Sequence, residues 1–200
     1  NIIKQLGHHI IEPIPSLFTF NLPNESIKNN LQGISVKNAQ IKIVQNKLQY
    51  NGPVLITHWG LSGPAVLKLS AFAATDFYKQ NYFSDIMVNW VYPLKPIEVE
   101  LFIKQFQKNK HKALPYSQSM FDLPKRLWEF LCIKSDILNT KPWAEVNNKQ
   151  INKLVQSLCN YLLKMEGKTT FKEEFVSCGG VSLKEINFKT MESKLVPNLF

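Results

Sequence analysis

Residues 57–67 have the sequence Thr57-His58-Trp59-Gly60-Leu61-Ser62-Gly63-Pro64-Ala65-Val66-Leu67. An aliphatic and β-branched run, residues 54–56, precedes them and predicts a buried strand. Ser62 is a favoured N-cap residue and Pro64 is favoured in the first helical turn, so we expect a helix from about Pro64 to Tyr78. A glycine turn that leads into a helix exposes free N–H groups, which attract anions. The stretch therefore predicts either an anion site or an ordinary strand-to-helix connection.

The chain before this stretch alternates apolar and polar residues, which is typical of strands with one solvated face. A weak bend is expected at Lys37-Asn38, and a turn at residues 45–47. We predict an antiparallel meander over residues 15–57 and a further strand over residues 85–91. The strand signals of the meander cover residues 16–22, 33–37, 39–44, 48–50 and 54–57, and Asn51-Gly52 is expected to interrupt the last strand as a bulge or a second turn.

Beyond Pro93 the apolar residues follow the helical period, and strand-like segments return near residues 169–171 and 174–178. The predicted helices cover residues 97–108, 123–133 and 148–165. Their expected core consists of Leu101, Phe102, Phe106, Leu127, Trp128, Phe130, Leu131, Leu154, Leu158, Tyr161 and Leu162. We therefore expect an α+β fold with a β-rich part, residues 1–92 and 167–200, and a three-helix part, residues 93–166.

The chain has 200 residues and a net charge of +9, which raises nucleic acid as a partner. The excess is almost wholly lysine, because Arg126 is the single arginine, and base readout relies on arginine. Apart from a local group at Lys104, Lys108, Lys110 and Lys112, the lysines are scattered. We interpret them as solvated surface and expect no nucleic-acid partner. A lysine-rich module that binds acidic partners stays open as the alternative.

Several kinds of site are disfavoured by the residue pattern. His58 and Ser62 could serve as the base and the nucleophile of a hydrolase. However, the G-x-S-x-G elbow is absent and no carboxylate is near in sequence. Cys132, Cys159 and Cys178 form no zinc spacing or disulfide framework, so we expect no metal and a reducing, cytoplasmic setting. The chain has no G-x-G-x-x-G and no P-loop, and no apolar run long enough to span a membrane, so no membrane partner is expected.

Three motifs, taken in order, resemble one family. They are Gly7-His8…Pro13…Pro15-Ser16-Leu17, the stretch Thr57 to Ala65, and Gly179-Gly180-Val181…Glu185-Ile186…Thr190-Met191-Glu192-Ser193-Lys194…Pro197-Asn198-Leu199-Phe200. The whole chain is similar to part of the YhiN/BaiN-type flavoproteins, also called aminoacetone-oxidase-like FAD-binding enzymes. Asn198 stands where the family usually has glycine.

The resemblance implies a Rossmann-like FAD domain interrupted by a long insert, a β-barrel-like subdomain that carries a small helical bundle. This chain is similar to that insert and to the first residues of the segment that leads back into the FAD domain. Both ends therefore indicate a segment of a longer protein. The implied parent is an FAD-dependent oxidoreductase, with NAD(P)H as a candidate donor. The implied partners are the FAD domain of the same chain and a small-molecule substrate.

The resemblance identifies no catalytic residue, but it implies candidates for the flavin side. By analogy with fumarate-reductase-like flavoproteins, Gly179 and Gly180 are expected to approach the flavin ring, and Ser62 and Gly63 at the helix start are the second candidates. Because the phosphate-binding loop and the closing segment are missing, we expect no FAD on this chain alone. A flavin absorbance band in the purified chain would contradict this.

Overall fold

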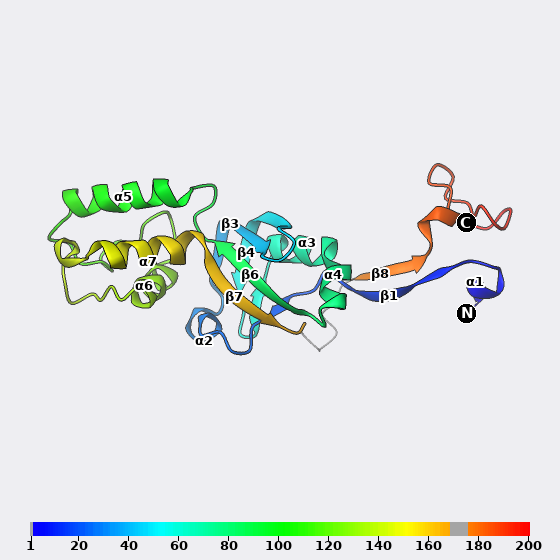
Figure 1. Ribbon diagram of the computed structural model, residues 1–200, viewed down its shortest axis with the longest axis horizontal. Coiled ribbons are helices and arrows are strands. Elements are labelled where there is room, and N and C mark those ends of the chain that lie inside the picture. Colours follow the sequence, from blue (N-terminus) through cyan, green and yellow to red (C-terminus); the bar gives the residue numbers. More distant parts are fainter. Residues whose placement is uncertain (1, 169–175) are drawn as a thin grey trace.

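The computed structural model describes residues 2–168 and 176–200. An antiparallel six-stranded sheet occupies the middle of the molecule (Figure 1). Helices α5, α6 and α7 lie at one end, and a two-stranded ribbon leads from the sheet to both termini at the other end. The predicted α+β class is confirmed.

The elements have the following bounds. The larger sheet contains, in spatial order, β2 (Phe20–Asn21), β5 (Gly60–Ser62), β4 (Gln49–Ile56), β3 (Ser35–Ile43), β6 (Phe83–Asn89) and β7 (Tyr161–Glu166). The ribbon pairs β1 (Ile10–Ser16) with β8 (Val176–Val181). The helices are α1 (Ile2–Gln5), α2 (Ile27–Leu31), α3 (Pro64–Phe72), α4 (Ala74–Lys79), α5 (Pro96–Asn109), α6 (Lys125–Lys134) and α7 (Asn148–Cys159), with short 3₁₀ turns η1 (Trp143–Glu145) and η2 (Leu183–Glu185).

The sheet curls into a nearly closed barrel, because its first and last strands meet. The Asn21 backbone N–H donates to the Gly167 carbonyl oxygen at 3.3 Å, and Phe20 forms an antiparallel bridge with Lys168. Closure protects the strand edges that would otherwise offer unpaired backbone groups. The barrel-like architecture implied by the resemblance is therefore confirmed.

Alternating side chains of the strands fill the barrel. Ile41 and Ile43 of β3 and Val54 and Ile56 of β4 are all buried. Each such aliphatic side chain contributes roughly 1.5–3 kcal/mol through removal from water. Three rings complete the core, and the Phe20 and Phe77 rings meet edge to face at 5.3 Å. The buried aromatic set of the barrel is Phe18, Phe20 and Phe77.

The helical part is organised around α7. Asn147 and Gln150 form a capping box at its start, with reciprocal hydrogen bonds of 3.0 Å. The predicted core is wrong at Leu101 and Phe102 of α5, which are 61% and 47% exposed, and at Leu162. Partly buried and packed against the core are Phe106, Phe130 and Tyr161. The predicted core residues that are buried are Leu127, Trp128, Leu131, Leu154 and Leu158. The apolar residues of α5 extend over more of its surface than its neighbours cover. The buried residues of the three helices are Val99, Ile103, Leu127, Trp128, Leu131, Cys132, Ile151, Leu154, Val155, Leu158 and Cys159.

The predicted helix over residues 148–165 is too long. It ends at Cys159, and residues 161–166 form β7, which pairs antiparallel with β6. Leu163 and Met165 are buried while Leu162 beside them is 53% exposed, which is strand alternation. A short apolar run fits both the helical and the strand period, and here the backbone pairing with β6 makes it a strand. The division into domains at residues 92 and 166 stays a prediction.

The first predicted helix begins at Pro64, as expected, but its predicted N-cap residue is wrong. Ser62 belongs to β5 and pairs with Leu55, so it is not a cap; Gly63 is the N-cap residue of α3. The helix is interrupted at Ala73, and Phe72 turns outward to stack on Tyr50 with ring centroids 5.2 Å apart. Because β5 pairs with β4 through Ser62, the strand continues to the residue just before the N-cap of α3.

Two further expectations concern the strands. The bend expected at Lys37-Asn38 is a register shift inside one continuous strand, β3, between Val36 and Ala39. The expected strand signals at residues 169–171, and those at 174–175, lie outside the described residues. None of the helices in the described ranges combines the length and apolar character that crossing a membrane requires.

Candidate functional site

The stretch Thr57–Leu67 forms a β-hairpin followed by α3. Thr57 closes its tip: its N–H donates to the Gly60 carbonyl oxygen at 2.8 Å, and its hydroxyl accepts from the Gly60 N–H at 3.1 Å. A Cβ atom at Gly60 would lie 2.1 Å from the carbonyl oxygen of Phe20. Gly60 is therefore required for the close approach of β2 to β5.

The candidate pair Ser62 and Gly63 lies between β5 and α3. Gly63 has φ +99°, and a Cβ there would lie 2.8 Å from the Pro53 carbonyl oxygen, so backbone packing explains this glycine too. His58 is exposed at the hairpin tip with its ring 3.6 Å from the Trp59 ring. Among the described hydrogen bonds none joins His58 to Ser62, so the structure does not assemble a hydrolase pair.

The candidate pair Gly179 and Gly180 lies on β8, in the ribbon rather than the barrel. The two glycines have different surroundings. A Cβ at Gly179 would lie 2.6 Å from the Glu12 carbonyl oxygen of β1, whereas a Cβ at Gly180 would meet no atom within 4 Å. Gly179 is therefore a packing residue, and the backbone at Gly180 is open to another group.

A polar network that the sequence reasoning missed joins the first and third motifs. The His8 ring is buried between two partners, with Nδ1 2.8 Å from a Glu185 carboxylate oxygen and Nε2 2.9 Å from the Ser193 hydroxyl. Ser193 also accepts the N–H groups of Leu195 and Val196, at 3.1 and 2.9 Å. These partners are satisfied when His8 is neutral with its proton on Nδ1 and the Ser193 hydroxyl donates to Nε2.

This His8–Glu185–Ser193 network has the residue types of a nucleophile, a base and a carboxylate, but its geometry is structural. Ser193 is buried, and its oxygen is occupied by two backbone N–H groups and His8. The Glu185 carboxylate also accepts the His9 backbone N–H at 3.1 Å. The network therefore fastens the start of the chain to the segment after β8. The signal that could have found it was the presence of all three residues in the quoted motifs.

Acid is expected to open this network. The hydrogen bond from His8 is the largest cause that lowers the pKa of Glu185, with the His9 N–H adding to it. A lowered carboxyl pKa stabilises the folded state above the unfolded value of about 4.3, and this contribution is lost as the pH falls through the folded value. The NMR signal of the His9 amide proton should shift as the pH falls below about 4. The shift should disappear in Glu185→Gln, and a shift that persists there would assign it to another group.

Lysines gather beside a shallow groove between α6 and α7. The lysine groove is widely open to solvent, and its lining residues are Lys134, Lys149, Asn152, Lys153, Gln156 and Ser157. Helix α7 turns its apolar side to the core and leaves Lys149 and Lys153 exposed. Three ammonium groups next to hydrogen-bonding amides and a hydroxyl suit a chain of phosphates. The lysine groove is thus the strongest candidate for binding an extended anion on the helical part.

One acidic side chain borders the groove. Asp136, at the start of the loop after α6, forms an ion pair with Lys153. The hydrogen bond from Lys153 is the largest cause that lowers the pKa of Asp136, so Asp136 is ionised at neutral pH. Its negative charge offsets one of the lysines of the groove, and its removal would make the groove more positive.

Comparison with known families gives one match that spans most of the chain. The model described as the HI0933-like protein barrel and H2TH domain matches residues 14–176. The chain belongs to this family. The match contains the barrel and all three helices of the helical part, while the network of His8, Glu185 and Ser193 lies outside it.

Two curated proteins are similar to this HI0933-like domain along its whole length. Both bear the name ribosomal RNA dihydrouridine synthase. The one from Escherichia coli is 27% identical over 207 residues, and the one from Haemophilus influenzae is 29% identical over 208 residues. Each alignment covers 100% of this chain and 47% of the relative, so the chain spans about half the length of these proteins.

The thiols of the HI0933-like domain give no sign of reactivity in its helical part. Cys132 and Cys159 are buried, and burial raises the pKa of Cys159 to about 11 and that of Cys132 further. At neutral pH both are therefore thiols rather than thiolates. Within residues 2–168 and 176–200, no cluster of three or more His, Cys, Asp or Glu side chains could hold a metal ion.

Proposed function

We propose that this chain is the substrate-side domain of a flavin-dependent enzyme that reduces uridine in ribosomal RNA. The observation that carries the proposal is the similarity, along the whole chain, to two proteins named ribosomal RNA dihydrouridine synthase. The family match and the resemblance to FAD-binding enzymes support a flavin in the parent protein. The FAD-containing half would be the part of the relatives that this chain does not cover.

The chemistry of the product is compatible with a flavin. Conversion of uridine to dihydrouridine saturates the C5–C6 double bond, with a hydride added to one carbon and a proton to the other. A reduced flavin, when bound, supplies the hydride and is itself oxidised, and the protein contributes binding and orientation. The described residues of this chain would hold the RNA rather than carry the redox step.

The arrangement of the chain supports this division of roles. The β1–β8 ribbon brings the two ends of the chain to one end of the molecule, as an insert within another domain requires (Figure 1). The lysine groove lies on α6 and α7, at the opposite end. A small substrate at the ribbon end could not touch the groove, whereas a polymer could contact both. We therefore favour RNA over the small-molecule substrate implied by the resemblance.

The charge of the surface fits RNA as well. We expected the lysines to be solvated and the protein to have no nucleic-acid partner, and the names of the relatives leave that expectation unconfirmed. Lysine, as a compact charge, neutralises phosphates without reading bases. Shape and position of the RNA would then supply the selectivity.

We place the flavin edge, within the same proposal, beside Gly180. The open space at this glycine would let a flat ring approach the backbone of β8. Gly180→Ala in the intact protein should lower FAD affinity by about tenfold or more, because a methyl group then occupies the approach. Gly7→Ala is the matched control, since Gly7 also has a positive φ and open surroundings. Equal FAD content of the two variants, measured by absorbance, would count against this position.

The reaction itself is tested with ribosomal RNA. Deletion of the gene that encodes the intact protein should remove dihydrouridine from one ribosomal RNA position, detected by mass spectrometry of nucleosides, and re-expression should restore it. Unchanged dihydrouridine would overturn the proposal. RNA binding that weakens with salt, without dihydrouridine formation, would instead favour the lysine-rich interaction module.

A further inference from the structure

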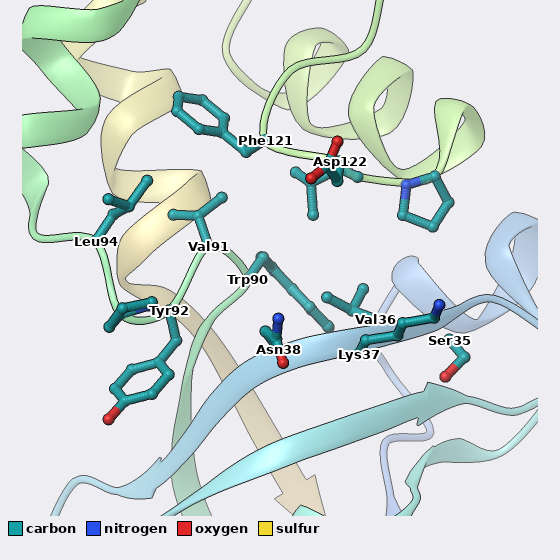
Figure 2. A pocket seen from close by; sticks show the side chains of 13 residues that line it. Ser35, Val36, Lys37, Asn38, Trp90, Val91, Tyr92, Leu94, Phe121 and Asp122 are labelled. Carbon is teal, nitrogen blue, oxygen red and sulfur yellow. The ribbon is translucent and has the colours of Figure 1, made fainter.

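A cleft of about 670 Å³ lies where the barrel meets the helical part, and none of its residues belongs to the motifs discussed above (Figure 2). Its walls come from three segments that are far apart in the sequence: residues 35–38 of β3, residues 90–94 after β6, and residues 121–124 before α6. The volume falls within the range of roughly 300–1,000 Å³ usual for ligand sites. The cleft is therefore large enough to hold a nucleotide-sized group.

The first wall is shaped by the β-bulge in β3. The register with β4 shifts between Val36 and Ala39, so Lys37 and Asn38 together occupy the place of one residue. Successive side chains of a regular strand point to opposite faces. Here both Lys37 and Asn38 are exposed, while Val36 and Ala39 on either side are buried. The bulge thus turns an ammonium group and a carboxamide to the same side, beside the cleft.

The opposite wall contains two neighbouring residues in an unfavourable backbone conformation. Phe121 has φ +58° and Asp122 has φ +54°, which is uncommon for residues other than glycine and often marks functional sites. The Phe121 ring lies against Phe102, with centroids 4.8 Å apart. Figure 2 shows Asp122 across the cleft from Lys37 and Asn38. A carboxylate therefore faces an ammonium and an amide, while the Phe121 ring points away from them toward Phe102.

Between the two walls lies Trp90. Its side chain is buried, and its indole N–H has no hydrogen-bond partner among the residues that the structure describes. Most buried polar groups in native proteins are paired, so an unpaired one calls for an explanation. Trp90 is one of the residues that line the cleft, but its N–H is closed to solvent, so a ligand reaches it only if the neighbouring side chains move.

We propose that this cleft binds one unpaired nucleotide of the RNA, with uracil or guanine as its base. The proposal rests on the function proposed above. Uracil has a ring N–H between two carbonyl oxygens, and guanine has a ring N–H beside one. The N–H would donate to Asp122, while a carbonyl oxygen would accept from the Asn38 side chain. Lys37 would neutralise the phosphate. The Asp122 carboxylate disfavours a bare phosphate ion, whose charge it would repel.

The position of the cleft supports this assignment. It lies between the helices that carry the lysine groove and the barrel that leads to the β1–β8 ribbon. An unpaired nucleotide held there would fix the register of the strand, because base contacts specify position while phosphate contacts only hold it.

The test uses the intact protein and two ribosomal RNA fragments, one with unpaired uridines replaced by 4-thiouridine and one with unpaired guanosines replaced by 6-thioguanosine. After irradiation, crosslinked peptides identified by mass spectrometry should contain residues 90–94 or 121–124. Lys37→Ala should lower the yield of these crosslinks about fivefold. Asp122→Asn should lower it as well, and asparagine tolerates the positive φ of this position. Lys47→Ala, an exposed lysine in the turn after β3, is the control and should leave the yield unchanged.

Two results would overturn the inference in different ways. Crosslinks confined to other segments, or equal yields for Lys37→Ala and Lys47→Ala, would remove the nucleotide from the cleft while dihydrouridine formation still supports the proposed function. An intact protein that neither binds ribosomal RNA nor forms dihydrouridine would remove the proposed function and this inference together.

Discussion

Replacing Gly60 with alanine is expected to lower the free energy of unfolding of the chain by about 3 kcal/mol, the upper part of the usual range for overpacking. The added methyl carbon would lie 2.1 Å from the Phe20 carbonyl oxygen. Neither strand can easily retreat, because Phe20 is fully buried and the neighbouring Leu22 N–H donates to the Trp59 carbonyl oxygen at 2.8 Å. Urea denaturation followed by circular dichroism measures the change.

Gly33→Ala separates steric overlap from backbone strain. Gly33 has φ +84°, and a Cβ there would meet no atom within 4 Å, so alanine should cost only the left-handed strain of about 1 kcal/mol. Gly60 has no positive φ, and its expected loss is therefore steric alone. Similar losses for the two variants would show that β2 moves away from β5 at little cost.

Removing the three lysines of the groove is expected to give the second large effect. In the intact protein, the combined change Lys134→Ala, Lys149→Ala and Lys153→Ala should weaken ribosomal RNA binding about tenfold or more at physiological salt. Each phosphate contact that is lost reduces the slope of log affinity against log salt by about one. Because Asp136 already offsets Lys153, we expect the slope to fall by about two rather than three. Fluorescence anisotropy over a series of salt concentrations measures both quantities.

Two controls test whether the loss of RNA binding comes from the lysine groove. Replacing Lys47, Lys68 and Lys79, three exposed lysines of the barrel part, changes the net charge equally but should alter binding much less. Asp136→Asn should tighten binding, since it removes the negative charge beside the groove and asparagine tolerates its φ of +60°. Equal loss in both triple variants would attribute the effect to overall charge.

The helices show which structural features the local sequence pattern predicts and which it does not. The boundaries of α5 were predicted closely, because a proline at its start and a regular apolar period are local signals. The same reasoning extended α7 through residues 160–165, where the residues fit both periods. It also placed Leu101 in the core, since periodicity gives the apolar side of a helix but not how much of it a neighbour covers.

The candidate sites also divide into those that the sequence indicated and those that only the structure reveals. Gly179 and Gly180 were named together as candidates from their motif, and only the structure shows that Gly180 has open surroundings while Gly179 is closely packed. The lysine groove could not be predicted, because Lys134 and Lys149 are separated by 15 positions and only the packing of α6 on α7 makes them neighbours. The cleft is still harder to predict from the sequence, because three distant segments meet there.

Composition, periodicity and motifs were enough for the α+β class, the bounds of α5 and the resemblance to a flavoprotein family, because each depends on residues close together in the chain. Tertiary structure was needed for the closure of the barrel through Asn21 and Gly167, the network of His8 with Glu185 and Ser193, and the bulge that turns Lys37 and Asn38 into the cleft. These features arise from backbone pairing and side-chain contacts between segments that lie far apart in the chain. Such contacts leave no local period, so only the folded chain reveals them.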